Sequence, residues 1–140
     1  MNSKLFYKYF KKYHFKGPWK LEPIPNQKKY QFIIIIPSFS EYEYLPNLLF
    51  SIANQDKQLL KKLLVVIVIN NSASSNESII QNNKRTHKYC RDYKFSYDVS
   101  IIDAWSDKKA FNDKKGGGVG YARKIGSDLS LLYCDFNTII

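Results

Sequence analysis

The sequence predicts an α/β fold built on a mostly parallel β-sheet with flanking helices. Short runs of β-branched residues, typical of buried strands, recur along the chain. Segments with helical periodicity separate these runs. Because parallel strands need a crossover connection, usually a helix, this alternation favours the right-handed crossovers of a Rossmann-like layer.

Three segments are predicted as complete strands. The first, Gln31–Ile36, contains four consecutive isoleucines and is ended by Pro37, so we expect both of its faces to be buried. The second, Leu63–Ile69, is equally apolar, and in the third, Phe95–Asp103, apolar and polar side chains alternate. Thr138–Ile140 has the composition of a fourth strand that is just beginning. We therefore expect the sheet to be incomplete at the C-terminus.

Helices are predicted between and after these strands. Apolar residues at helical spacing mark Leu45–Ile52, where Pro46 suits the first turn. The S-x-x-E spacing of Ser74–Glu77 is typical of a capping box and predicts a helix over roughly residues 75–92. A glycine-rich stretch, KGGGVG, precedes the last helix, which the periodicity of Tyr121–Leu132 indicates.

Residues 1–29 are predicted to form a basic aromatic arm outside a domain of residues 30–140. The arm carries a net charge of +7, from eight lysines and Glu22, out of +10 for the whole chain. Aromatic residues and lysines alternate at helical spacing in it, Ser3 suits the N-cap, and Gly17-Pro18 ends the helix. Two interpretations stay open: the helix rests on an anionic membrane surface, or its aromatic face packs on the body.

The composition limits which kinds of partner, metal site and location are expected for this chain. Of 22 basic residues only Arg85, Arg91 and Arg123 are arginine, whereas readers of nucleic acid usually depend on the arginine fork, so no specific nucleic-acid partner is expected. The two cysteines and two histidines are isolated in sequence and indicate neither a disulfide framework nor a zinc site. No signal peptide or membrane-spanning run is evident, so a cytoplasmic location is expected, with peripheral membrane contact through the arm.

The glycine-rich stretch does not match two common phosphate-binding motifs. No Gly-Lys pair exists, so the phosphate loop of nucleotide hydrolases is absent. The dinucleotide fingerprint also fails, because its last position is Tyr121 when counted from Gly116 and Arg123 when counted from Gly118. A structural role for the glycines remains open. Helix N-terminal amides together with Arg123 would suit an anionic ligand such as a diphosphate.

Three stretches in this order, IIIIPSFSEYEYLPNLLFSI, VIVINNSAS and GGGVGYARKIGSD, resemble family 2 glycosyltransferases. The resemblance covers roughly residues 30–140 and implies a GT-A fold, specifically its nucleotide-sugar-binding half. It implies a donor site made of Pro37, Ser38, Phe39, Glu41, Asn70, Ser72, Gly118, Val119, Gly120 and Arg123. In this family the loop after the first strand surrounds the base and ribose, and the glycine loop lies against the phosphates. Glu41 has the acceptor chemistry that ribose hydroxyls require.

Two departures from the family pattern bear on function. Asn70 stands where relatives commonly have an aspartate that reads the base, which leaves the base preference open. Relatives also carry a D-x-D motif on the next strand, whose carboxylates hold Mg²⁺ or Mn²⁺ against the diphosphate. This chain reaches Ile140 before that motif, and Asp135 precedes the apolar run instead of ending it. The metal ligands and catalytic residues are therefore expected beyond Ile140, and none within the chain.

Two function hypotheses follow. In the first, the chain is the donor-binding part of a glycosyltransferase, inactive alone, whose complete form moves a sugar from a UDP- or GDP-sugar to a saccharide or other hydroxyl acceptor. In the second, it is a non-catalytic nucleotide-binding or interaction module that uses the basic arm. Because a truncated sheet leaves a strand edge unpaired, self-association is also expected.

Overall fold

A computed structural model describes residues 3–113 and 117–140 and contains a three-stranded, all-parallel sheet. The strands are β1 (Phe32–Ser38), β2 (Leu63–Asn70) and β3 (Asp98–Ala104), and they lie in the order β1-β2-β3. All eight residues of the central strand β2 are buried, as its continuous apolar sequence predicts. The predicted α/β class with a parallel, Rossmann-like sheet is confirmed at this level.

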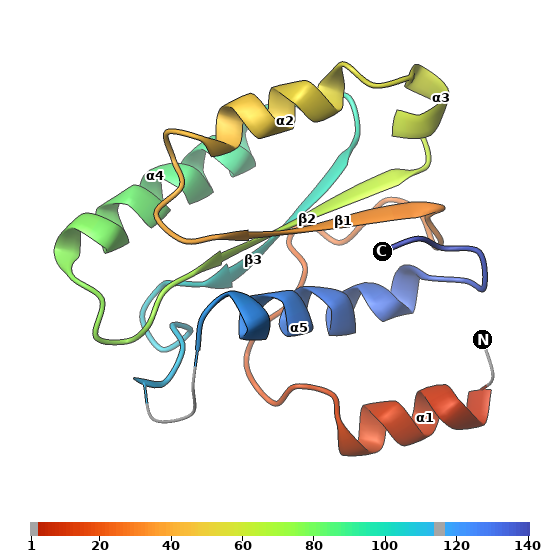
Figure 1. The fold of residues 1–140 in the computed structure, drawn as a ribbon, viewed down its shortest axis with the longest axis horizontal. Coiled ribbons are helices and arrows are strands. Elements are labelled where there is room, and N and C mark those ends of the chain that lie inside the picture. Colours follow the sequence, from red (N-terminus) through yellow and green to blue (C-terminus); the bar gives the residue numbers. More distant parts are fainter. Residues whose placement is uncertain (1–2, 114–116) are drawn as a thin grey trace.

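Helices cover both faces of the sheet (Figure 1). They are α1 (Ser3–Lys12), α2 (Leu45–Ala53), α3 (Lys57–Leu60), α4 (Glu77–Asp92) and α5 (Val119–Ser130), the last followed by the 3₁₀ turn η2 (Leu131–Tyr133). The helices α2 and α4 pack on one face and α5 on the opposite face, with α1 outside α5. Each sheet face therefore has its own hydrophobic core, since successive side chains of a strand point to opposite faces.

The polar loops that follow the strands lie at one edge of the sheet. Ser38, the last residue of β1, is in register with Ile69, and Asn70, the last residue of β2, with Ala104. Parallel pairing thus places the carboxyl ends of all three strands together. Ligands of open α/β sheets usually bind at this edge.

Several sequence-based expectations about the elements need correction. Ile33 and Ile36 of β1 are buried in the cores on opposite faces of the sheet, as expected, but Ile34 of the same strand is 38% exposed. The third strand begins at Asp98, three residues later than expected, because Phe95 and Tyr97 precede it in the α4–β3 connection. The predicted fourth strand forms only one parallel bridge, between Ile139 and Phe32. Beyond that bridge no other described residue pairs with the outer edge of β1, and self-association through this edge stays a prediction.

The starts of two helices also differ from expectation. The N-cap of α4 is Asn76, whose side chain accepts a hydrogen bond from the Ile79 amide (3.1 Å), so the capping box proposed for Ser74–Glu77 is wrong. The short helix α3 was not expected. Its N-cap, Asp56, accepts hydrogen bonds from the amides of Gln58 and Leu59.

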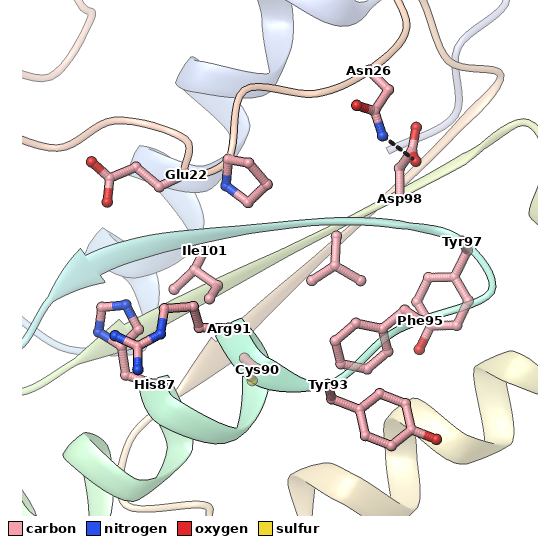
Figure 2. A pocket seen from close by; sticks show the side chains of 12 residues that line it. Glu22, Asn26, His87, Cys90, Arg91, Tyr93, Phe95, Tyr97, Asp98 and Ile101 are labelled. Atoms are coloured by element: carbon pink, nitrogen blue, oxygen red, sulfur yellow. Dashed lines mark hydrogen bonds between the residues drawn. The ribbon is translucent and has the colours of Figure 1, made fainter.

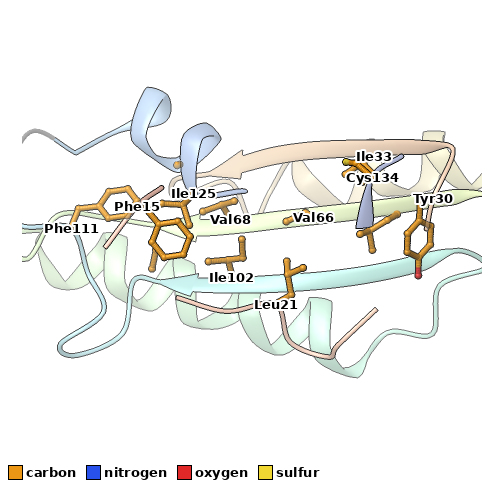
Figure 3. Packing of buried hydrophobic residues seen from close by; sticks show 13 residues of the cluster. Phe15, Leu21, Tyr30, Ile33, Val66, Val68, Ile102, Phe111, Ile125 and Cys134 are labelled. Atoms are coloured by element: carbon orange, nitrogen blue, oxygen red, sulfur yellow. The ribbon is translucent and has the colours of Figure 1, made fainter. Parts of the chain in front are cut away.

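The N-terminal arm packs on the body of the protein. Phe15 and Leu21 belong to the core between the sheet and α5 (Figure 3). Asp128 of α5, 1% exposed, accepts hydrogen bonds from the Tyr9 hydroxyl and from the Phe15 amide (3.0 Å). Lys124 completes the cluster with an ion pair to Asp128 at 2.8 Å. The aromatic side of the arm thus packs on the body, the second of the two interpretations left open above.

Across residues 3–113 and 117–140, no helix is both long and apolar enough to cross a membrane.

Candidate functional site

Residues from three segments line a cavity at the carboxyl edge of the sheet. Its volume is about 390 Å³, and its lining residues are Pro37, Phe39, Glu41, Asn70, Gly118 and Val119. All six belong to the donor site that the resemblance implies, although they come from three distant parts of the sequence. The structure therefore brings together the loop after β1, the end of β2 and the start of α5.

Asn70, which lines this cavity, has a buried polar atom without a hydrogen-bond partner in the part of the chain that the structure describes. Within the described residues, Ser38 Oγ and Asn70 Oδ1 are the buried side-chain atoms that have no hydrogen-bond partner. Ser38 is 0% exposed and Asn70 is 3% exposed. A buried polar atom without a partner costs about 1–3 kcal/mol, so each such atom in a native fold requires a reason. A polar ligand that enters the cavity would supply one.

Asn83 of α4 fixes the loop that forms one wall. Its fully buried side chain donates to the Asn70 carbonyl (3.1 Å) and to Asn71 Oδ1 (2.8 Å), and it accepts from the Ser40 amide (3.0 Å). Ser40 itself has a positive φ of 55°, which is uncommon for a residue other than glycine. The neighbouring Asn82 accepts from the Tyr42 amide (3.0 Å).

The positioning role of Asn83 was not predicted from the sequence. The available signal was a pair of asparagines in the middle of a helix, where this residue is a poor helix former. Such residues are tolerated when their amide groups satisfy backbone groups of a neighbouring loop.

Gly118 and Val119 line the cavity at the start of α5. Gly118 is the N-cap with φ 109° and ψ −167°, a conformation that is essentially restricted to glycine. Gly118 has no side chain to cap this helix end, and among the described residues no other side chain accepts from its first amides, which would suit an anion. Gly126, further along α5, has a packing role, since a Cβ there would lie 2.5 Å from Ile35 Cγ2.

The other predicted site residues lie outside the cavity lining. Ser38 is buried but does not line the cavity, Gly120 is exposed in the first turn of α5, and Arg123 is exposed on the same helix. The Ser72 hydroxyl lies within hydrogen-bond distance of the Ser74 and Ser75 hydroxyls (3.2 and 3.3 Å), and no lining contact of Ser72 with the cavity is found. The roles predicted for these residues stay predictions. Lys115 and Gly116 of the glycine stretch lie outside the described residues.

The described part of the chain holds no group of three or more His, Cys, Asp or Glu side chains arranged to bind a metal ion. Asp135 caps its own turn, accepting from the Asn137 amide at 2.8 Å. Both cysteines are free and buried, and burial raises the pKa of the Cys90 thiol to about 12. Such a thiol is a poor nucleophile.

A second cavity, of about 540 Å³, lies along the outer edge of β3 (Figure 2). The arm, the C-terminal half of α4 and β3 form its walls, where Glu22, Arg91 and Asp98 contribute charged groups. In contrast to the first cavity, its lining includes no buried polar atom that lacks a partner among the described residues. Size alone therefore does not select the functional site.

His87, at one end of this second cavity, has a defined tautomer. The Trp105 indole Nε1–H donates to His87 Nδ1 (3.0 Å), and because an indole N–H can only donate, Nδ1 is unprotonated and Nε2 carries the hydrogen. Burial lowers the pKa of His87 from its ordinary value, although the nearby Asp103 carboxylate offsets part of this effect. The neutral ring is the form that fits the fold.

Comparison with protein-family profiles, characterised proteins and experimentally solved structures finds no match to this chain. The class that the fold defines is thus an α/β protein with an open, parallel, Rossmann-like sheet. A functional assignment depends on the chemistry of the cavity at its carboxyl edge.

Proposed function

We propose that residues 30–140 form the donor-binding part of a GT-A glycosyltransferase, which holds a nucleoside diphosphate sugar at the carboxyl edge of the sheet. The single observation that carries the proposal is the cavity beside β1, β2 and α5, in whose lining Asn70 has a buried Oδ1 atom without a partner among the described residues. Its lining coincides with six residues that the family resemblance implies.

The chain topology supports a ligand at this position. The connection from β1 through α2 to β2 covers one face of the sheet, whereas the connection from β3 through α5 covers the other and returns to Ile139, which bridges to β1. The direction in which successive strands are added to the sheet therefore reverses at β1. Crevices at such switch points are where open α/β sheets bind nucleotides.

The residues present fit the parts of a nucleoside diphosphate. Asn70 Oδ1 can accept a hydrogen bond from a base N–H group, and the Glu41 carboxylate from ribose hydroxyls. Phe39 is 48% exposed, which leaves its ring available to stack on a base. The uncapped amides at the start of α5 suit the diphosphate, with Arg123 three residues beyond Gly120 on the same helix.

The metal ion of this proposal, Mg²⁺ or Mn²⁺, would neutralise the diphosphate leaving group. The family resemblance implies that its ligands lie beyond Ile140, and we propose them there. We therefore expect this chain to bind nucleotide without transferring sugar. The acceptor, a saccharide or another hydroxyl compound, would bind outside the described site.

The proposal is tested by calorimetric titration of the chain with UDP and GDP. Glu41→Ala removes a ligand acceptor and Asn70→Ala a base contact, so we expect each variant to bind the preferred nucleotide several-fold more weakly, or about 1–2 kcal/mol. Arg123→Ala should have an effect of the same size because it removes a phosphate contact.

Asp92→Ala is the matched control. It removes an exposed carboxylate from the C-terminal end of α4, away from the cavity, and should leave nucleotide affinity unchanged. Affinity that is equal in the wild type and in the Glu41, Asn70 and Arg123 variants would contradict the proposed site. Binding of NAD in preference to UDP and GDP would instead point to a dehydrogenase-type sheet.

A further inference from the structure

The outer face of α1 is a cationic surface with exposed apolar side chains. Its members are Lys4, Leu5, Tyr7, Lys8, Lys11 and Lys12, all exposed, and together we call them the lysine face. We propose that the lysine face docks the protein on a membrane surface rich in anionic lipids. This proposal does not depend on the nucleotide site.

The orientation of α1 leaves the lysine face outward. The opposite side of the helix is held against α5, where the Tyr9 hydroxyl donates to Asp128 and the Lys124 ammonium donates to the Tyr13 carbonyl (2.7 Å). Phe6 and Phe10 are half-buried on that same side, with ring centroids 4.6 Å apart. Two faces of one helix therefore have different roles. The aromatic face anchors α1, and the lysine face remains accessible.

All charged side chains of the lysine face are positive. Helix α1 contains four lysines and no acidic residue. Among the described residues, Lys8, Lys11 and Lys12 form no ion pair with a carboxylate. Anionic headgroups would supply counter-charges for these lysines. Each lysine close to an anionic leaflet strengthens binding by about fivefold.

The apolar members distinguish a bilayer from other polyanions. Leu5 is 66% exposed and Tyr7 is 70% exposed, and they flank the four lysines of the lysine face on either side. In a bilayer interface, such side chains enter the boundary between headgroups and acyl chains while lysines extend to the phosphates. A nucleic acid offers no partner for Leu5, and a face without arginine lacks the planar fork that favours phosphate recognition in nucleic acids.

The test is sedimentation of the full chain with sonicated vesicles, either of phosphatidylcholine alone or of phosphatidylcholine and phosphatidylserine in equal parts. We expect binding to the mixed vesicles only, and we expect added salt to weaken it because the attraction is electrostatic. Lys8→Glu with Lys11→Glu should weaken this binding by more than about twentyfold, from the contribution of two lysines.

Lys57→Glu with Lys61→Glu is the matched control. These two exposed lysines lie at α3, on the opposite side of the molecule (Figure 1), and their replacement changes the net charge by the same amount. The control should retain vesicle binding. The milder pair Lys8→Gln with Lys11→Gln should be intermediate, and equal urea midpoints show that all variants fold.

Three outcomes would overturn the proposal. The wild type fails to bind the mixed vesicles, it binds neutral vesicles equally well, or both charge-reversal pairs weaken binding to the same extent. In the first of these outcomes, salt-dependent binding to single-stranded RNA would assign the lysine face to nucleic acid instead.

Discussion

At the scale of single residues, buried polar side chains form hydrogen bonds between segments that are far apart in the sequence. The position of Asn70 at the end of a buried strand was enough to predict that it lies at the carboxyl edge of the sheet. The lack of a partner for its Oδ1 becomes visible only in three dimensions. The partners of Asn83 and Asp128 could not be predicted, because they lie 43 and 113 residues away, at Ser40 and Phe15.

His87 provides a pH-dependent prediction at this scale. Burial lowers the pKa of His87 in the folded state below its ordinary 6.5, so the unfolded chain binds the proton more readily. The stabilising contribution of neutral His87 is therefore present above pH 6.5 and is lost as the pH falls from there through its folded pKa. Protonation also breaks the hydrogen bond from Trp105, because Nδ1 can no longer accept.

Urea unfolding on both sides of pH 6.5 measures this contribution. We expect His87→Gln to lose part of the pH dependence that the wild type shows in this window. Identical pH dependence in the wild type and the His87 variant would contradict the assignment.

At the scale of elements, strands and helices followed from local patterns, whereas their limits depended on tertiary contacts. The three strands and the helices α2, α4 and α5 were predicted because buried runs and 3.6-residue periodicity are local signals. The start of β3 was misplaced since the Tyr97 hydroxyl donates to the Leu49 carbonyl (2.8 Å), which directs the alternating segment toward α2 before the strand begins. The four-residue helix α3 is too short to show a period.

The close approach of α5 to the sheet yields a stability prediction. A Cβ added by Gly126→Ala would lie 2.5 Å from Ile35 Cγ2 and 3.1 Å from Val68 Cγ2, both on stiff β-branched side chains. Overpacking of this kind costs about 1–3 kcal/mol, more than the helix propensity gained, so the free energy of unfolding should fall.

Gly120→Ala in the same helix is the control, because the added Cβ meets no atom within 4 Å. It should leave stability unchanged or raise it by up to about 1 kcal/mol. Urea midpoints compare the two variants. A Gly126 variant at least as stable as the Gly120 variant would show that α5 does not pack on β1 and β2 as described.

At the scale of the whole molecule, the arm and the body form one structure joined by a buried polar cluster. Asp128 holds the arm through Tyr9 and Phe15, and it pairs with Lys124. Burial disfavours the Lys124 ammonium, but its hydrogen bonds to Asp128 and Tyr9 outweigh this, and the pKa of Lys124 is raised. The sequence indicated an amphipathic helix, yet the position of its docking partner on α5 depends on tertiary structure alone.

Replacement of Asp128 should release the arm. Asp128→Ala leaves the Phe15 amide and the Tyr9 hydroxyl without their acceptor, so we expect a loss of about 3 kcal/mol in unfolding free energy. Limited trypsin digestion should then cut sooner at Lys11, Lys12 and Lys16. Trypsin should cut the Asp92→Ala variant, which changes an exposed carboxylate, at the same rate as the wild type. An unchanged cleavage rate in the Asp128 variant would contradict the anchoring role.

We have proposed that the cavity at the carboxyl edge of the sheet binds a nucleoside diphosphate. A titration of the ¹⁵N-labelled chain with UDP and GDP, followed by backbone amide NMR, tests it most directly. We expect concentration-dependent shifts at Ser38, Glu41, Asn70, Gly118 and Val119, with none at the second cavity around Asp98 and Ile101. Shifts confined to the second cavity, or no shifts with either nucleotide, would contradict the account.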